Sequence, residues 1–429
     1  MTRTNLLFRS VVGSVGGRVA VLIAPFLVMP AMLDYLGVGD FGIWMTAIAV
    51  TGFIQFADLG IGSGLLTRLS AAHARGDMRA FRFYVASSFA ALLLVALTVS
   101  SIGLVCLVFL SDTLSPIYSV TLIAFAFSIP GSIIYRIQYA TDRIVLANVW
   151  QVGGALLSVG AAFAAIRTGW GAPKVVFAYV IVGPLTMLAA TVWTMWREPE
   201  KRPKVTDIRA WATIDLMGLG WKFFTLAVLT AASMNADNIL IALQLGEAAV
   251  TSYAVPARIG TLLMLIAGTI AMPLWTIYGG AITSGDRSWV WRNALLMAGL
   301  GLVAVVAVGA ILTIAIDLIL NLWIGRSFPD QHKIVAGLVG FSAVTALTAP
   351  FNMILNAAGQ VKMQIAVWGF FVPIAISAKW VLLPLIGAWV LPLVDALLYS
   401  FMITVPVFFF ARLAIRTDYA NDSPSESFS

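Results

Sequence analysis

Charged residues are scarce in this sequence, and so are the residue types that build most metal and disulfide sites. Asp, Glu, Lys and Arg make up only 10% of the 429 residues, whereas an ordinary soluble domain contains roughly 25%. Cys106 is the single cysteine, which excludes a disulfide framework and the cysteine spacings of zinc and haem sites. The two histidines, His73 and His332, fall on opposite sides of the topology derived below. The sequence therefore predicts no metal site and no cofactor.

Motifs for nucleotide hydrolysis are also missing. The pattern G-x-x-x-x-G-K-[ST] does not occur, and no predicted loop could house an ATPase domain. The predicted outer loops are short, and the longest covers 321–333. Membrane enzymes that act on lipid-linked sugars usually display their acids and bases in long loops. We therefore expect no enzyme and no catalytic residue.

Apolar residues are abundant instead, at 61% of the chain, with a mean hydropathy of +0.97. Apolar runs of about 18 or more residues recur along the whole length, each long enough to cross a hydrocarbon core of roughly 30 Å. We therefore expect an all-α integral membrane protein with about twelve transmembrane helices. The predicted spans are 15–33, 41–61, 83–110, 119–135, 145–166, 175–196, 218–243, 251–278, 294–320, 334–355, 364–383 and 389–411.

The positions of Lys and Arg give these spans an orientation. Four arginines follow the second span, and another basic group follows the sixth, while the outer loops hold only Arg167, Lys174, Arg326 and Lys333. Cytoplasmic loops carry such an excess of positive charge, so both termini are predicted to be cytoplasmic. The same rule accounts for the pI of about 9.6 without a nucleic-acid partner.

The basic segment after the sixth span divides the chain into two halves of six spans each. Leu36-Gly37 and Leu245-Gly246 are 209 residues apart, as are Gly76-Asp77 and Gly285-Asp286. This shared offset indicates a duplication, with the two six-helix lobes related by a pseudo-two-fold axis along the membrane normal. The predicted division is an N-terminal lobe (1–196), a cytoplasmic basic linker (197–213), a C-terminal lobe (214–412) and a disordered cytoplasmic tail (413–429).

Three cationic residues within or at the start of the spans are candidates for binding a substrate. An ionisable side chain in the bilayer costs at least about 2.5–3.5 kcal/mol, so it tends to line a cavity or find a partner. Arg258 lies about seven residues into the eighth span, and either lines a cavity or pairs with Asp237. Arg18 and Lys222 occupy equivalent positions in the first and seventh spans, where they either bind substrate or extend to the head groups.

Acidic residues in the spans are candidates for ion coupling or for a structural role. Asp237 belongs to the polar stretch Asn235–Asn238, which is hard to expose to lipid and should face protein or water. Asp58 ends the second span, where we favour a structural role. Lys379 and Asp395, on the last two spans, are expected to form an ion pair.

The residues 36–44 (LGVGDFGIW) and 58–62 (DLGIG) resemble the first two spans of polysaccharide repeat-unit (O-antigen, Wzx-type) flippases. The second half, with 237–241 (DNILI), Leu245-Gly246 and Tyr253, resembles them too. These flippases belong to the multidrug/oligosaccharidyl-lipid/polysaccharide exporter superfamily. The resemblance implies flipping of an undecaprenyl-pyrophosphate-linked oligosaccharide to the outer leaflet of a bacterial inner membrane, through a cationic cavity with alternating access.

The substrate implied by this resemblance agrees with the cationic candidates, because a pyrophosphate in a low-dielectric cavity needs Arg or Lys donors. Only three clear candidates are present, which leaves the charge of the substrate open. The resemblance also implies membrane lipids and the glycosyltransferase and polymerase machinery as partners. Two alternatives stay open at this point. One is a cation-coupled drug or metabolite antiporter of the same superfamily, and the other is a non-transporting membrane scaffold.

Overall fold

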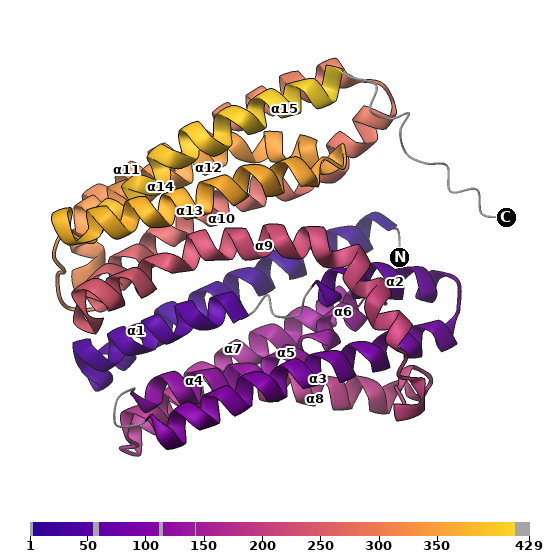
Figure 1. Ribbon diagram of the computed structural model, residues 1–429, viewed down its shortest axis with the longest axis horizontal. Helices are drawn as coiled ribbons and strands as arrows, with labels where there is room; N and C mark the ends of the chain where they lie inside the picture. The colour runs from indigo at the N-terminus through magenta and orange to yellow at the C-terminus, as the bar shows by residue number, and fades with distance from the viewer. Residues whose placement is uncertain (1–2, 55–59, 111–114, 142, 417–429) are drawn as a thin grey trace. The chain divides into compact units, whose positions relative to one another are not determined.

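A computed structural model describes residues 3–54, 60–110, 115–141 and 143–416. Throughout this part of the chain the regular structure is helical, and it contains no β-strand. The chain divides into two compact units, Met1–Val228 and Leu229–Ser429. In each unit the long helices run alongside one another (Figure 1). The predicted tail is described only as far as Arg416.

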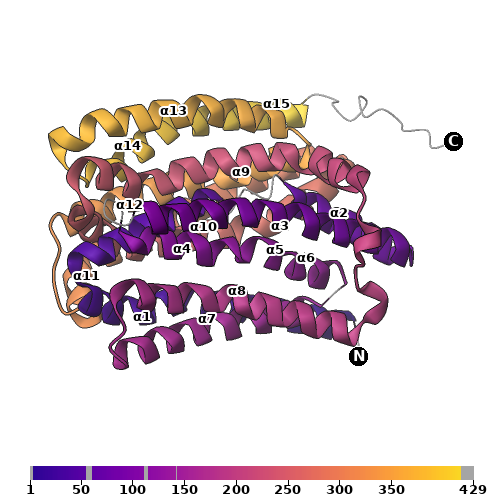
Figure 2. The same ribbon diagram turned by 60° about the horizontal axis from the view of Figure 1, so that its bottom comes forward.

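Unit 1 contains eight α-helices, two short 3-10 turns and the beginning of a ninth helix, counted over the residues described. These are α1 (Arg3–Ile54), α2 (Ile61–Ala74), α3 (Met78–Phe109), α4 (Pro116–Ala126), α5 (Ser128–Gly131), α6 (Ile133–Ala140), α7 (Ile144–Arg167), α8 (Ala172–Arg197), η1 (Pro199–Lys201), η2 (Val205–Asp207) and the first part of α9 (Ala210–Leu245). The helices α7 and α8 pack side by side, as Figure 2 shows.

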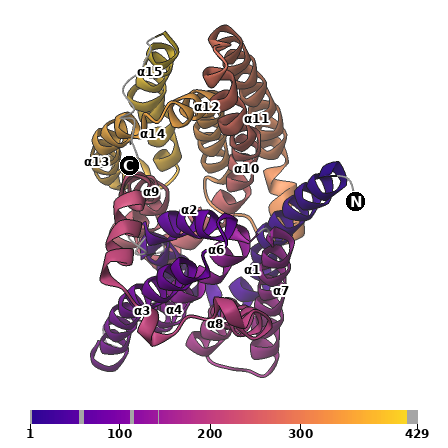
Figure 3. The same ribbon diagram turned by 90° about the vertical axis from the view of Figure 1, so that its right-hand side faces the viewer.

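Unit 2 contains the rest of α9 and the following helices, with one π-helical turn. These are α10 (Glu247–Thr283), α11 (Arg287–Trp323), α12 (Gln331–Ala357), α13 (Val361–Ile386), α14 (Val390–Tyr399), η3 (Ser400–Thr404) and α15 (Val405–Arg416). Figure 3 shows α12 between the pair α10 and α11 and the pair α14 and α15, and α12 packs against all four. Buried apolar side chains of α10, α11 and α12 form a core there.

Ten helical segments of the described chain are long and apolar enough to cross a membrane. The first two predicted spans are not separate among these ten, because 15–33 and the part of the second span up to Ile54 both lie in α1, where Gly37 has φ 72° and ψ 173° and interrupts the helix. The rest of the second span includes 55–59, which are outside the described residues. The predicted span 251–278 lies within the 37-residue helix α10. The fold class predicted from the sequence, an all-α integral membrane protein, is confirmed.

The backbone repeats the 209-residue offset that the sequence indicates. Gly37 and Gly246 have the same unusual conformation, with φ 72° and ψ 173° at the first and φ 86° and ψ 167° at the second. Gly76 and Gly285 both have positive φ, at 69° and 82°. Each is followed by an aspartate whose side chain caps the next helix. These matches support the duplication, while the rotation that would relate the two halves stays a prediction.

The beginning of α9 clusters with unit 1, although the sequence predicted residues 214–412 as one lobe. Glycines explain this packing, because they let two backbones approach closely. A Cβ at Gly220 would lie 2.0 Å from the carbonyl oxygen of Gly60, and a Cβ at Gly64 would lie 2.4 Å from the carbonyl oxygen of Leu216. The start of α9 is therefore held against α2 through backbone contact.

We expect Gly220→Ala to destabilise unit 1 by about 1–3 kcal/mol, the usual cost of overpacking, because the neighbour of the added methyl group is backbone and cannot rotate away. The matched control is Gly218→Ala on the same helix, where an added Cβ meets nothing within 4 Å. That change should be neutral or slightly stabilising, since alanine favours the helix. Thermal unfolding of the purified protein measures both. Equal unfolding temperatures for the two variants would contradict the close contact.

Polar contacts fix the linker and the start of α9 to unit 1. Arg68 Nε and Nη2 donate to the two carboxylate oxygens of Asp215, at 2.7 and 2.6 Å, and the Tyr84 hydroxyl donates to Asp215 at 3.0 Å. The hydrogen bonds from Arg68 lower the pKa of Asp215 below its ordinary value, because they favour the charged carboxylate. In the linker, Glu198 forms ion pairs with Arg143 and with Lys201. The predicted basic linker is thus a folded segment on unit 1.

Candidate functional site

A cluster of charged side chains is buried in unit 2 and is the site most capable of chemistry there. We call it the Lys379 cluster, and it consists of Lys379 on α13, Asp237 on α9, Asp395 on α14 and Tyr253 on α10. The Lys379 side chain is only 1% exposed, and the Asp395 side chain only 6%. Four helices therefore contribute to one buried polar site inside a membrane protein.

The hydrogen bonds of the cluster join it into one network. The Lys379 ammonium donates to Asp237 Oδ1 and to Asp395 Oδ2, both at 2.6 Å. The Tyr253 hydroxyl donates to the second oxygen of Asp237, Oδ2, at 2.5 Å. Both carboxylate oxygens of Asp237 therefore have donors. Asp395 Oδ1, in contrast, is buried and has no hydrogen-bond partner.

The charges of the Lys379 cluster do not balance. Two carboxylates and one ammonium leave one negative charge when all three groups are ionised, and tyrosine adds a donor without adding charge. A buried charge without compensation is costly, so such a site favours binding one positive charge. Asp395 Oδ1 is the carboxylate oxygen of the network that can take up a proton without losing an existing hydrogen bond.

The local sequence explains why these groups meet. Gly246 turns the chain between α9 and α10, with φ 86°, so Asp237 and Tyr253 lie on neighbouring helices at similar distances from the turn. Gly387 does the same between α13 and α14, with φ 104°, for Lys379 and Asp395. Each pair comes from one helical hairpin, and the two hairpins meet at Lys379.

The structure confirms the ion pair that was predicted between Lys379 and Asp395. The participation of Asp237 and Tyr253 was missed, although charged residues inside a span are functional candidates by default. The sequence signal was Lys379, a single lysine within the apolar run of α13. A charge at such a position needs partners inside the protein, and not only a partner at the surface. As predicted, the polar stretch around Asp237 is not exposed, and its three polar residues are half-buried.

The cationic candidates are distributed over the two units. Arg18 lies on α1, and its side chain is outside the described part of the structure. Lys222 is half-buried on the part of α9 that clusters with unit 1. Arg258 is half-buried on α10 in unit 2. Their convergence on one cavity stays a prediction, and Asp58 falls in 55–59, outside the described residues.

Comparisons with known proteins agree with this architecture. The family described as "Polysaccharide biosynthesis protein" matches residues 7–275. A "Putative O-antigen export protein" of Yersinia pseudotuberculosis is 19% identical over 406 residues, covering 91% of this chain and 92% of that protein.

Solved structures show a similar fold. An inward-facing multidrug resistance MATE family transporter of the MOP superfamily has a TM-score of 0.79 at 14% identity, covering 94% of this chain and 96% of its own. An outward-facing structure of a MATE family transporter has a TM-score of 0.65 at 16% identity, covering 96% and 95%. A MOP superfamily transporter from Pyrococcus furiosus has a TM-score of 0.62 at 15% identity, covering 93% and 95%.

The helical fold and the family match define a multi-pass membrane protein whose fold is similar to that of MOP-superfamily transporters. Because the family match covers more than half of the chain, the protein belongs to the polysaccharide biosynthesis protein family.

Proposed function

We propose that this transporter flips an undecaprenyl-pyrophosphate-linked oligosaccharide from the inner to the outer leaflet of a bacterial inner membrane, for cell-surface polysaccharide biosynthesis. The observation that carries the proposal is the family match over residues 7–275. The relative named as an O-antigen export protein supports it over almost the full length. Arg258, Arg18 and Lys222 are the residues proposed to hold the pyrophosphate.

The Lys379 cluster is proposed to couple this movement to an ion gradient. A proton taken up by a carboxylate from one side of the membrane neutralises the excess negative charge, and its release to the other side restores that charge. The two protonation states favour different packing of α9, α10, α13 and α14, because protonation of Asp395 removes the negative charge that pairs with Lys379. Substrate movement in exchange for the proton completes the cycle.

A second candidate is favoured by the same cluster, namely a cation-coupled antiporter of drugs or metabolites. A buried carboxylate that exchanges protons serves either substrate, so the cluster alone does not separate the two functions.

Both functions share a proposed orientation with both termini in the cytoplasm, motivated by the distribution of Lys and Arg. A reporter that is active only in the periplasm, fused after Ser429, should therefore be inactive.

Reconstitution of the full chain in liposomes tests the proposal. The lipid-linked oligosaccharide is placed in one leaflet, and the fraction that a membrane-impermeant glycosidase can cleave is followed with and without a pH gradient. We expect the gradient to accelerate flipping in the natural protein. In Asp395→Asn the pH gradient should have little effect on the flipping rate, because the asparagine amide does not take up a proton at the pH of either side. Slow downhill flipping should persist.

The controls separate flipping from antiport. Lys362→Gln, at an exposed position at the start of α13, should behave as the natural protein. Exchange of a cationic dye for protons without any flipping of the lipid-linked sugar would refute the flippase and support the antiporter. Gradient-driven flipping at the full rate in Asp395→Asn would refute coupling through this cluster and leave the flippase intact.

A further inference from the structure

A row of exposed apolar side chains runs along the end of the linker and the start of α9, in unit 1. It consists of Val205, Ile208, Trp211, Ile214 and Met217, which follow one another at every third residue and are 36–84% exposed. We call this row the 205–217 ridge. Single apolar residues on a surface are normal, whereas a contiguous exposed patch marks an interaction site. The ridge is therefore a candidate docking surface, and none of the proposed transport or coupling residues belongs to it.

The opposite face of the same segment packs on unit 1. Ala212, Leu216 and Asp207 are buried. The Arg209 backbone N–H donates to the Ser87 hydroxyl of α3 at 2.9 Å. The segment is therefore amphipathic, and its apolar ridge points away from the helices that support it.

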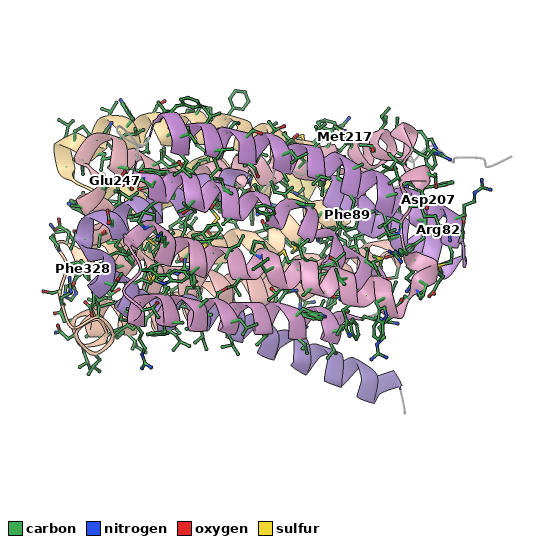
Figure 4. The ribbon with its side chains drawn as sticks, turned by 90° about the horizontal axis from the view of Figure 1, so that it is seen from below. Arg82, Phe89, Asp207, Met217, Glu247 and Phe328 are labelled. Atoms are coloured by element: carbon green, nitrogen blue, oxygen red, sulfur yellow. The ribbon has the colours of Figure 1, made fainter. Side chains whose placement is uncertain are left out.

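The charged residues of the segment divide in the same way. Its two acids, Asp207 and Asp215, turn toward unit 1, while its one basic residue, Arg209, is exposed. Asp215 binds Arg68 as described above. Asp207 Oδ2 accepts from a linker backbone N–H at 3.0 Å and lies 3.7 Å from Arg82 Nε. Figure 4 shows Arg82 and Asp207 near each other at one end of the helices. The outward face thus carries positive charge.

Two guanidinium groups are gathered around one aromatic ring beside the ridge. The Cζ atom of Arg209 lies 5.0 Å from the centroid of the Phe83 ring, and that of Arg79 lies 5.6 Å from it. Trp211 of the ridge meets the same ring edge-on, at 6.4 Å between centroids. Ring contacts position a cation without neutralising it. Two positive charges held this close repel each other, and an anion beside them relieves that repulsion.

The position of the ridge indicates which anion this is. The part of α9 that is long and apolar enough to cross a membrane begins at Gly220, after the ridge. In Figure 1 the start of α9 runs at an angle to α3, across the ends of the unit 1 helices. Amphipathic segments with tryptophan and basic residues lie in the zone between lipid head groups and acyl chains. The abundant anions of that zone are the phosphates of lipid head groups.

We propose that the 205–217 ridge and the neighbouring pair Arg79 and Arg209 form a docking surface for anionic phospholipids. The apolar side chains of the ridge insert among the upper parts of the acyl chains. The two guanidinium groups bind phosphate oxygens of the head groups, which their forked geometry suits. The bound lipids hold the linker and the start of α9 at the membrane surface. They are structural ligands, distinct from the transported substrate.

Local enrichment of an anionic lipid tests this surface. A fluorophore is attached at position 214 through Ile214→Cys in a Cys106→Ser background, which removes the single native cysteine. The full chain is placed in nanodiscs of phosphatidylcholine and phosphatidylglycerol, with a nitroxide near the head group of one lipid or the other. At equal nitroxide content, phosphatidylglycerol should quench the fluorophore several-fold more than phosphatidylcholine. This quenching ratio should fall as salt is added, because salt screens exposed charges.

The arginine pair should account for the excess of phosphatidylglycerol. In Arg79→Gln/Arg209→Gln the quenching ratio should fall threefold or more, toward one, because each basic residue near an anionic surface contributes roughly fivefold in affinity. Arg79→Lys/Arg209→Lys should keep most of the ratio, since it keeps both charges. The matched control is Arg167→Gln/Lys174→Gln, which removes two exposed charges at the opposite end of unit 1 and should keep the full ratio. An equal ratio in all variants would overturn the proposal.

Other occupants of the ridge give different results. If the ridge docks a soluble protein, the fluorophore at position 214 faces water in nanodiscs, and iodide quenches it as strongly as the free dye. If a second copy of the chain covers the ridge, neither nitroxide lipid quenches the fluorophore, and native mass spectrometry shows a dimer. Either result would overturn the lipid assignment. The unfolding temperature checks that the glutamine variant is folded. If it is not, a quenching ratio of one in the natural sequence at low salt would still refute the proposal.

Discussion

Replacing Lys379 with methionine is expected to abolish gradient-driven transport and to lower the free energy of unfolding by about 3–5 kcal/mol, the usual cost of removing one partner of a buried ion pair. The ammonium is the only cation in the network, and its removal leaves Asp237 and Asp395 facing each other across the space it filled. Methionine has a similar length and is apolar, so the loss comes from charge and not from a cavity. Denaturant unfolding in micelles and the reconstituted flipping assay measure the two effects.

The matched control for this change is Lys362→Met, on the same helix but at an exposed position, where little change is expected. The informative variant replaces all three charged residues of the Lys379 cluster with neutral ones, by combining Lys379→Met, Asp237→Asn and Asp395→Asn. It should recover much of the stability, because no uncompensated charge remains buried. Gradient-driven transport should stay lost if the cluster exchanges protons. Recovery of gradient-driven transport together with stability would mean that the cluster is only structural.

The repeated turns show what could be predicted from the sequence. The pairs Leu-Gly and Gly-Asp are short, but glycine at these turns is required by a positive φ that other residues rarely adopt. The backbone constraint is local, so it is visible in the sequence at both Gly37 and Gly246. The same holds for the capping aspartates after Gly76 and Gly285. The side chain of each accepts a hydrogen bond from the backbone N–H three residues further along the chain.

The Lys379 cluster shows what could not be predicted. Its members are separated by up to 158 residues, since Asp237 and Asp395 are the first and last of them. Apolar spans give no signal for which helix faces which, because lipid-facing and protein-facing residues are equally apolar. The sequence indicated that Lys379 and Asp395 pair across one hairpin, but the choice of α9 as the third helix depends on packing between hairpins.

The boundary between the two units, which lies within α9, could not be predicted from the sequence for a similar reason. The basic linker is the most polar segment between the two halves, so the sequence favoured a division there. The packing of Gly220 on Gly60 and the ion pair between Arg68 and Asp215 keep the start of α9 with unit 1. Both depend on contacts over about 150 residues of chain, and glycine is common throughout this sequence.

Replacing Arg258 with alanine is expected to reduce flipping of the lipid-linked oligosaccharide at least tenfold, with normal membrane insertion. Arg258 lies about seven residues into the predicted span 251–278, which places it about 10 Å below the membrane surface at 1.5 Å per residue. A guanidinium at such a depth is costly unless it is hydrated or paired. A hydrogen bond to a charged group contributes about 1.5–3 kcal/mol, which corresponds to a factor of about ten or more. Arg258→Lys should lose only part of the rate, since lysine binds phosphate as a point charge.

The rival explanation is that Arg258 stabilises α9 through Asp237 instead of contacting substrate. The structure gives both carboxylate oxygens of Asp237 donors from Lys379 and Tyr253, so we expect Arg258 to act independently of that carboxylate. A double-mutant cycle with Arg258→Ala and Asp237→Asn decides between them. Additive losses in the flipping rate support substrate contact. If the double variant instead regained much of the rate lost in either single variant, the pair would be structural. Full activity of Arg258→Ala at normal abundance would remove this residue from the mechanism, and the proposed pyrophosphate site would lose its only member in unit 2.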